Sequence, residues 1–467
     1  MNLLRISLIA GCSAMALPAQ AKNTTPEKPN VIIIITDQQF VGKLSFTGNP
    51  ALATPNFDRL VEAGYFFNNA FCAYPLSVPS RFTMFSGRYP SDFGVRGNEG
   101  VPTDLTSIET QLMGTAFLKA GYVTYYGGKS HLPQFRRPEQ SKNYGFTTDY
   151  SANQKEELGQ EAKKLITKLS DGDKPFLLVA SFINPHDICV FDKFANGGQV
   201  KGNGQIAQHI ADARAMPGKK FYGDVSPQLP PNYAPMIDAP SNTPGFRPGF
   251  NVDDWRLRRW TYDRLVENVD ADVKPIVDVI EEKGLLSNTI VVFVSDHGDM
   301  DASHQMEVKS APYNECQRVP FLFAGPGIPK KVDRENYVSS GVDLLPTLFD
   351  FAGIKIPSNC QGISLKPLLT GKAASTGRDY FFAEGANWYQ VIYQGRYKYT
   401  VIESPGFPDI LADLQTDPLE TRNVVKDPKY KEIRATLNGI LMDNLKQRGL
   451  KLDPNNKNKA GRVEVEE

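Results

Sequence analysis

The chain lacks an excess of charge of either sign, because its 52 lysines and arginines are balanced by 52 aspartates and glutamates. A balanced chain offers no overall electrostatic attraction to nucleic acid or to an anionic membrane. A local basic cleft for a small anion remains compatible with this balance, since net charge does not describe a single site. We therefore expect no nucleic-acid partner.

Long hydrophobic runs are also absent, so we expect no transmembrane segment. Residues 1–21 contain a basic Arg5, a short apolar run and the small-x-small pattern Ala19-Gln-Ala21, which together predict a signal peptide. The alternative is a bacterial lipoprotein box, IAGC, in which Cys12 would be lipidated. Both alternatives predict export, with the periplasm favoured and a lipid anchor at the cell surface as the second location.

Cysteine is scarce, and no two cysteines form a CxxC pair, which argues against a zinc site. Four cysteines remain if Cys12 is lost: Cys72, Cys189, Cys316 and Cys360. Two disulfides are possible in an oxidising compartment, but the spacing selects no pairing.

What the chain does contain is a series of short apolar runs that alternate with helical patterns. The runs cover residues 30–37, 122–129, 174–182, 288–296 and 319–327, and helical patterns cover residues 54–64, 106–120, 156–169 and 255–283. Four consecutive isoleucines in the first run indicate a strand buried on both faces. We predict an α/β fold over residues 28–375, with a large, mostly parallel central sheet flanked by helices.

Two regions differ from this pattern. Residues 186 to about 250 become rich in proline and glycine, and we expect a loop insertion that carries function or specificity. Residues 376–467 are predicted to form a smaller C-terminal α+β subdomain, because alternation around Gln394-Gly395 indicates a hairpin and an amphipathic helix follows.

Polar, titratable side chains directly follow four of the predicted strands. In open parallel sheets, ligands bind at the carboxyl ends of strands. The groups at these ends are Asp37 and Gln38, Lys129 and His131, His186, and Asp296 and His297. Their carboxylate, amide and imidazole groups suit a divalent cation, with Ca²⁺ or Mg²⁺ favoured by the oxygen atoms. Lys129, Lys309 and Arg81 offer positive charge to an anion. His131 and His186 can transfer protons near neutral pH.

Each of these residues also has an ordinary structural interpretation. Asp37 and Asp296 are compatible with helix caps, and a single histidine is more often a hydrogen-bonded structural residue. The combination favours function, because three of the five histidines follow predicted strands. A divalent cation, several cationic side chains and two histidines are what phosphoryl or sulfuryl transfer requires. We expect His304, in the loop after His297, to line the same cleft.

The stretch AYPLSVPSRFTMFSGRYP contains a more specific pattern, Ser77-x-Pro79-Ser80-Arg81 followed by Gly87. Taken alone, Ser77 would pass for a helix-capping serine. The pattern resembles the signature of the type I sulfatases, in the alkaline-phosphatase superfamily. The segments TPNFDRLVEAGYFFNNAFC, GYVTYYGGKSH, NPHD, NTIVVFVSDHGD and GVDLLPTLFDFAG also resemble family blocks in the expected order. The resemblance spans roughly residues 28–425 and implies an alkaline-phosphatase-like fold.

The resemblance implies that a radical-type sulfatase-maturating enzyme oxidises Ser77 to formylglycine. The hydrated aldehyde would attack sulfur, displace the alcohol and release sulfate by elimination. The resemblance also implies roles for the strand-end residues. Ca²⁺ would be bound by Asp37, Gln38, Asp296, His297 and the oxygen of residue 77, while Lys129 and Lys309 would bind sulfate, Arg81 would hold the formylglycine, His131 would assist the diol and His186 would be the acid at the leaving oxygen.

Three positions depart from the common family pattern. Many members have cysteine at position 77, and the serine form is associated with bacterial, oxygen-independent maturation. Gln38 replaces a frequent aspartate, and the lost negative charge predicts weaker calcium binding. His297 stands where asparagine is frequent.

The sequence thus predicts an exported sulfatase that acts on a sulfated carbohydrate, such as a glycosaminoglycan or a similar glycan. Arg96 and Asn98, shortly after the Ser77 segment, are expected to contact the substrate. One alternative is a phosphatase or phosphodiesterase of the same superfamily that uses unmodified Ser77. Another is a glycan-binding protein with an inactive site.

Overall fold

The computed structural model describes residues 28–452 except 100–102, 199, 201, 239–246, 248 and 404–406. The predicted signal peptide, including Cys12, lies outside the described residues. Among the residues that are described, no helix combines the length and the apolar character needed to cross a membrane.

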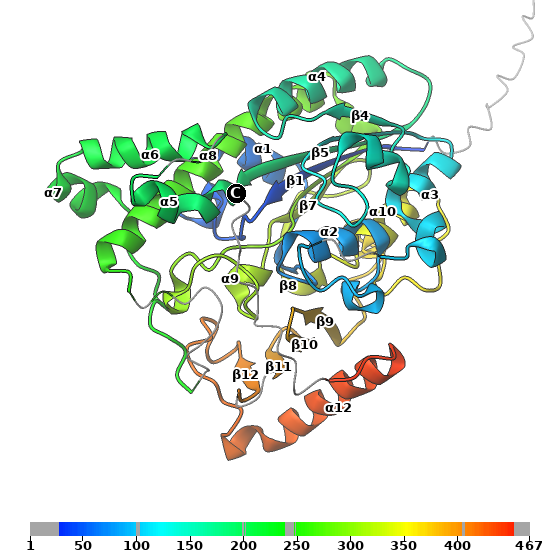
Figure 1. Ribbon diagram of the computed structural model, residues 1–467. Coiled ribbons are helices and arrows are strands. Elements are labelled where there is room, and N and C mark those ends of the chain that lie inside the picture. Colours follow the sequence, from blue (N-terminus) through cyan, green and yellow to red (C-terminus); the bar gives the residue numbers. More distant parts are fainter. Residues whose placement is uncertain are drawn as a thin grey trace, which may run out of the picture.

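An eight-stranded sheet forms the centre of the molecule (Figure 1). Its strand order is β4-β3-β5-β1-β6-β7-β2-β8. The bounds are β1 Asn30–Asp37, β2 Tyr65–Phe71, β3 Val123–Gly128, β4 Thr148–Ser151, β5 Phe176–Pro185, β6 Thr289–Ser295, β7 Phe321–Ala324 and β8 Lys331–Ser339. Strand β7 runs antiparallel to β6 and β2, and the other neighbouring pairs are parallel. The predicted mostly parallel α/β sheet is confirmed.

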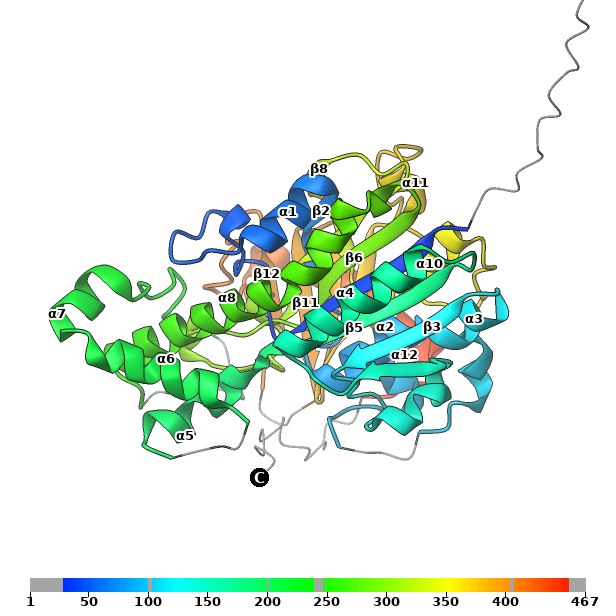
Figure 2. The ribbon, with the colours of Figure 1, turned by 90° about the horizontal axis from the view of Figure 1, so that it is seen from above.

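Helices cover both faces of this sheet (Figures 1 and 2). In β1, Val31, Ile33 and Ile35 pack in the hydrophobic cluster on one face, whereas Ile32 and Ile34 pack in the cluster on the other. This alternation is the period of two of a β-strand, and the helices supply a partner for each face. The first face is covered by α2 (Ser77–Ser86), α3 (Met113–Lys119) and α10 (Leu344–Ala352), and the second by α1 (Pro55–Ala63), α4 (Glu156–Ser170) and α8 (Val252–Glu282).

Three strands are not anticipated from the sequence. Strands β4 and β8 are the two edges of the sheet, where one side of the strand has no partner and polar residues are common. Strand β2 contains Asn68 and Asn69 between aromatic residues, which breaks the apolar pattern. Short or interrupted apolar runs carry a weaker periodic signal than a buried central strand.

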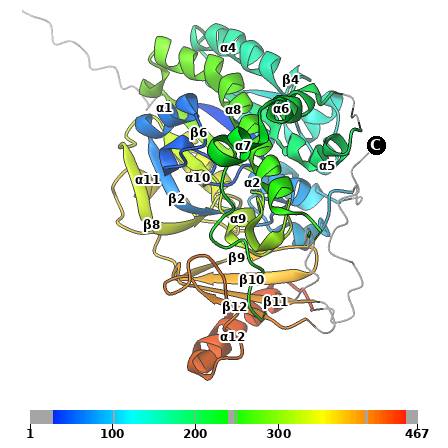
Figure 3. The same ribbon diagram turned by 90° about the vertical axis from the view of Figure 1, so that its left-hand side faces the viewer.

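The C-terminal part forms a separate antiparallel sheet, in the order β12-β11-β10-β9 (Figure 3). Its strands are β9 Tyr380–Glu384, β10 Trp388–Tyr393, β11 Tyr397–Ile402 and β12 Ile410–Asp413, and α12 (Lys431–Gln447) packs on one face. The predicted hairpin is confirmed, with Gln394 (φ 50°) and Gly395 (φ 62°) in the left-handed conformation that a tight hairpin turn requires.

The expectation that the segment after His186 is a loop is wrong for its first part. It contains α5 (Phe191–Ala195), α6 (Gly204–Ala215), α7 (Gly218–Lys220) and a π-helical turn at Phe221–Val225. Ile206, Ile210 and Ala213 of α6 are buried in a cluster with Trp260 of α8. A helix of this length is stabilised by that tertiary packing rather than by its own propensity. The sequence pattern alone did not predict it, because glycines and prolines lie nearby. The short α9 (Asn314–Gln317) and α11 (Lys366–Leu369) complete the α-helices of the described residues.

Candidate active site

Ser77 is the first residue of α2 and is completely buried. Its Oγ lies 3.0 Å from Nε2 of His297 and 3.5 Å from Oδ2 of Asp37. The residue at the cap position is Leu76, and the backbone N–H of Val78 donates instead to Oδ1 of Asn98 at 3.1 Å. The interpretation of Ser77 as a capping serine is therefore wrong. Its hydroxyl faces the ends of β1 and β6.

The sheet topology explains how two distant carboxylates meet. Strands β1 and β6 are parallel neighbours, and Thr36 is paired with Ser295. The next residues, Asp37 and Asp296, therefore emerge side by side at the carboxyl edge. Together with His297 they place one possible ligand atom each within 4.8 Å of one another, and all three side chains are buried.

His297 is arranged to offer a lone pair to this cluster. Its Nδ1 lies 2.9 Å from the carbonyl oxygen of Gly298, which can only accept, so Nδ1 carries the proton and Nε2 is free to accept. Burial, with Lys309 nearby, lowers the pKa of His297 to about 3, which keeps the ring neutral. Oδ1 of Asp37 is buried and accepts no hydrogen bond among the described residues. A buried carboxylate oxygen without a partner is costly, and a divalent cation would satisfy it.

Arg81 lies one helical turn after Ser77 and joins the strand ends. Its Nε and Nη2 each form a 2.9 Å ion pair, with Asp296 and Asp37 respectively. Its Nη1 donates to the carbonyl oxygen of Lys129 at 3.0 Å and to Oγ of Ser181 at 2.7 Å. One guanidinium thus connects β1, β5 and the residues that directly follow β3 and β6.

The two carboxylates have different proton affinities. Burial by itself would raise the pKa of Asp37, but the positive charges of Lys129 and Arg81 hold it well below its usual range. Burial, followed by the neighbouring charge of Asp37, raises the pKa of Asp296 to about 7. Such divergence is the expected result of crowding two acids in a dry site.

Two lysines from different segments reach the cluster. Nζ of Lys129 lies 2.9 Å from Oδ2 of Asp37, and Nζ of Lys309 lies 2.6 Å from Oε1 of Gln38. Lys309 stands between Val308 (φ 57°) and Ser310 (φ 76°), so its loop adopts a backbone that side chains other than glycine rarely favour. Both ammonium groups therefore lie at the strand ends beside Asp37 and Gln38.

The two predicted proton-transfer residues lie in the same electrostatic environment. Burial and the charge of Lys129 lower the pKa of His131 to about 2 and the pKa of His186 well below its usual value. Both imidazoles are therefore neutral near pH 7 in this state. Asp187, the residue after His186, forms an ion pair with Lys155, with its Oδ2 2.8 Å from the Lys155 Nζ.

The three residues that are predicted to contact the substrate have distinct locations. Asn98 caps the start of α2, as described above. Arg96 pairs with Glu403 at 2.8 Å and stacks on the ring of Tyr389, which connects the Ser77 region to the C-terminal sheet. His304 is buried, with its ring 4.5 Å from that of Tyr313, and no hydrogen bond or ion pair among the described residues joins it to Ser77, Asp37 or Asp296.

Three residues of the cluster were not predicted. Oδ2 of Asp299 accepts from Nε2 of Gln38 at 2.7 Å, and Arg258 pairs with Asp299. Cys189 donates to Oε1 of Gln38 at 3.1 Å. Asp299 carried a signal, since it follows His297 by two residues at the same strand end. Arg258 carried none, because an arginine on a long helix is usually exposed.

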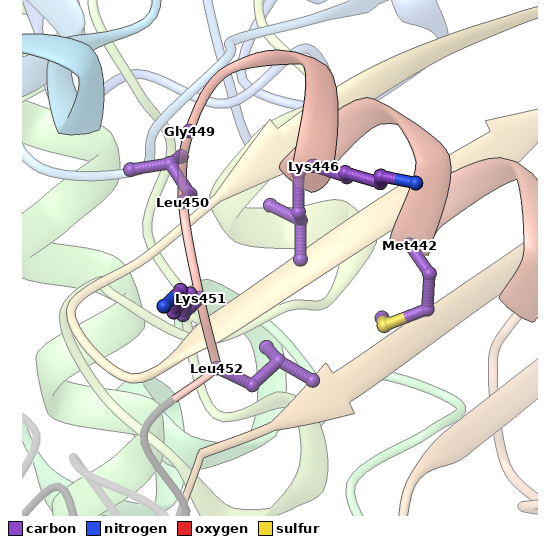
Figure 4. Close-up of a pocket in the computed structure, with 7 residues that line it drawn as sticks. Met442, Lys446, Gly449, Leu450, Lys451 and Leu452 are labelled. Atoms are coloured by element: carbon purple, nitrogen blue, oxygen red, sulfur yellow. The ribbon is translucent and has the colours of Figure 1, made fainter.

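A separate pocket of about 390 Å³ lies at the end of α12 (Figure 4). It is lined by Met442, Leu445, Lys446, Gly449, Leu450, Lys451 and Leu452. None of the predicted site residues lines it, so the chemistry is assigned to the buried cluster at the sheet edge.

The fold and this cluster define a hydrolase of the alkaline-phosphatase superfamily. The chain belongs to the sulfatase family: the Sulfatase family matches residues 29–354, and the C-terminal family of N-sulphoglucosamine sulphohydrolase matches residues 303–447. The protein is accordingly a sulfuric ester hydrolase.

Individual relatives agree with this assignment. The chain is 29% identical over 479 residues to the Delta 4,5-hexuronate-2-O-sulfatase of Bacteroides thetaiotaomicron, covering 95% of this chain and 94% of that protein. A solved structure of a 2-O GAG sulfatase has a TM-score of 0.75 and 28% identity, covering 91% of this chain and 95% of that one. A phosphonate monoester hydrolase of Agrobacterium radiobacter shares the fold, with a TM-score of 0.65, 22% identity, and coverage of 90% and 96%.

Proposed function

We propose that the protein hydrolyses a sulfate ester on a sulfated carbohydrate, using a formylglycine made from Ser77 and a bound Ca²⁺ ion. The proposal rests on one observation: four buried side chains lie close together, and Arg81 forms ion pairs with both carboxylates among them. The four residues are Ser77, Asp37, Asp296 and His297. The relatives named hexuronate-2-O-sulfatase and N-acetylglucosamine-6-O-sulfatase support a glycan substrate.

The donor set fits a calcium ion. Asp37, Asp296 and His297, with the oxygen of residue 77, would hold it. The amide oxygen of Gln38, the further ligand that the sequence predicts, instead lies 2.6 Å from the ammonium of Lys309. When bound, the ion neutralises charge on the sulfate oxygens. Mg²⁺ is the alternative, and it demands a smaller, more regular site.

The remaining residues act on the sulfate and its leaving group. Lys129 and Lys309 bind the non-bridging oxygens, because their ammonium groups already contact the cluster. His131 assists the nucleophile. His186 gives a proton to the leaving oxygen, which requires the arriving anion to raise the depressed pKa of this imidazole.

The modification of Ser77 supplies a nucleophile that can be regenerated. A hydrated formylglycine provides one hydroxyl for attack and a second that lets sulfate leave by elimination. Arg81, Asp37 and His297 surround position 77 and would orient that group. We propose that a radical-type sulfatase-maturating enzyme carries out the oxidation, and that the protein is exported to the periplasm, or anchored at the cell surface through Cys12.

Two measurements test the function. Mass spectrometry of the Ser77 peptide from natively matured protein should show loss of two hydrogen atoms, and a panel of sulfated mono- and disaccharides should contain a substrate. Ser77→Ala should abolish turnover. A peptide that retains serine, in a protein that cleaves phosphate esters well, would instead support the phosphatase or phosphodiesterase alternative. Binding of glycan with no turnover would support the inactive glycan-binding protein.

A further inference from the structure

The side-chain amide of Gln38 is held in one orientation by chemically unequal neighbours. Its Nε2 lies 2.7 Å from a carboxylate oxygen of Asp299, and a carboxylate only accepts. Two donors converge on its Oε1, the ammonium of Lys309 at 2.6 Å and the thiol of Cys189 at 3.1 Å. A turned amide would place its NH₂ group against the Lys309 ammonium, so the observed orientation is the only one that satisfies all three contacts.

Asp299 is kept as a charged acceptor by Arg258. The two side chains are fully buried and form two parallel hydrogen bonds of 3.0 Å each. The second carboxylate oxygen also accepts from the backbone N–H of Asp301 at 2.7 Å. The carboxylate is thus both ionised and immobilised.

Helix α8 holds Gln38 at a second point. The hydroxyl of Tyr262 donates to the backbone carbonyl of Gln38, and Tyr262 follows Arg258 by one helical turn on the same face. Gln38 itself has a left-handed backbone (φ 68°), with its N–H bonded to Oδ1 of Asp296 at 3.1 Å. One face of α8 therefore holds Gln38 at two points. Tyr262 binds its backbone, and Arg258 fixes its side chain through Asp299.

We propose that Arg258 and Asp299 are positioning residues that hold the Gln38 amide oxygen toward Lys309 and so place the Lys309 ammonium in the sulfate site. The inference rests on the proposed role of Lys309 in binding sulfate. It assigns Gln38 a task that is distinct from metal binding, and it explains why a buried arginine on α8 belongs to the active site.

A double-mutant cycle tests the proposal. In natively matured, calcium-loaded protein, Asp299→Asn can present an NH₂ group to Gln38 and release its amide. The affinity for inorganic sulfate, measured by calorimetry, and kcat/KM should both fall about 10- to 100-fold, the range for loss of a hydrogen bond to a charged group. In a Lys309→Met background, Asp299→Asn should cause little further loss, because its effect passes through Lys309.

Two further variants make the cycle decisive. If Asp299→Asn folds poorly, the double variant Arg258→Gln, Asp299→Asn takes its place, because it leaves no unpaired buried charge. It should show the loss of sulfate affinity that is expected for Asp299→Asn. Arg259→Gln is the matched control, since Arg259 is the next residue on α8 and pairs with Asp301 at 3.0 Å. It should lower the melting temperature without changing the affinity for sulfate.

The outcomes separate this inference from the proposed function. Equal losses in the wild-type and Lys309→Met backgrounds would overturn the positioning role while leaving the sulfate site intact. A Lys309→Met protein that binds sulfate as well as the wild type would overturn both the positioning role and the proposed role of Lys309 in binding sulfate, because Lys309 would then not contact the anion.

Discussion

Arg81 binds Asp37 and Asp296 at the same distance, 2.9 Å, with two different nitrogens of one guanidinium. Asp37 ends β1, and Asp296 directly follows β6, more than half of the chain further on. Arg81 belongs to the helix that begins with Ser77. A single side chain therefore joins the two carboxylates to the helix that begins with Ser77.

Arg81→Lys should damage both stability and activity. A lysine can reach only one of the two carboxylates, and breaking a buried ion pair costs about 3–5 kcal/mol. Denaturant unfolding should show this loss, and turnover of a sulfate ester should fall. Arg88→Lys, at a partly exposed pair with Asp92, is the control and should change stability by less than about 1 kcal/mol. Similar stability losses in both variants would contradict the bridging role.

Removal of the metal should destabilise the protein. Without a cation, the carboxylates of Asp37 and Asp296 repel each other in a buried site. Chelation should therefore lower the melting temperature, and added Ca²⁺ should restore it, with a gain of about 2.7 kcal/mol at a hundredfold excess over the dissociation constant. His297→Ala should weaken the restoration. A melting temperature that changes with neither chelator nor Ca²⁺ would argue against a metal at this site. If Mg²⁺ restores the melting temperature and Ca²⁺ does not, Mg²⁺ is the favoured ion.

Asp272 of α8 should produce a pH-dependent stability unrelated to catalysis. Burial, and then the charge of Glu156, raises the pKa of Asp272 to about 7, and its Oδ2 has no hydrogen-bond partner among the described residues. A raised pKa in the folded state means that ionisation opposes folding. The contribution to stability should thus decline as the pH rises from about 4 to about 7.

Asp272→Asn removes this titration. Compared with the wild type, the variant should gain stability at pH 8, on the order of a few kcal/mol, and much less at pH 4. Denaturant unfolding at the two pH values measures the difference. An equal effect of the substitution at both pH values would show that Asp272 does not titrate in this range.

Asn98 should act on the start of α2. Its Oδ1 accepts the N–H of Val78, so Asn98→Ala leaves a buried helix donor without a partner and should cost about 1 kcal/mol. Asn98→Asp retains an acceptor at the same place and should keep the stability. Its negative charge beside position 77 should nevertheless raise KM for an anionic substrate. If Asn98→Ala changes KM but not stability, Asn98 is a substrate contact rather than a cap.

Local pattern was sufficient for much of the architecture. The isoleucines of β1, the helix at Pro55–Ala63 and the hairpin at Gln394-Gly395 each have a strong signal that depends on near neighbours in sequence. Helix α6 and the edge strands β4 and β8 have weak signals, since packing partners distant in sequence stabilise them.

The sequence by itself determined which chemical groups stand at the ends of the central strands, because each lies directly after an apolar run. It therefore predicted Asp37, Asp296, His297 and Lys129 as one site. Only the tertiary structure decided how those groups are oriented. Ser77 faces His297 instead of capping its helix, and Gln38 is turned by Asp299 and Arg258 toward Lys309. Such orientations depend on hydrogen-bond partners more than 200 residues away, and no local period in the chain encodes them.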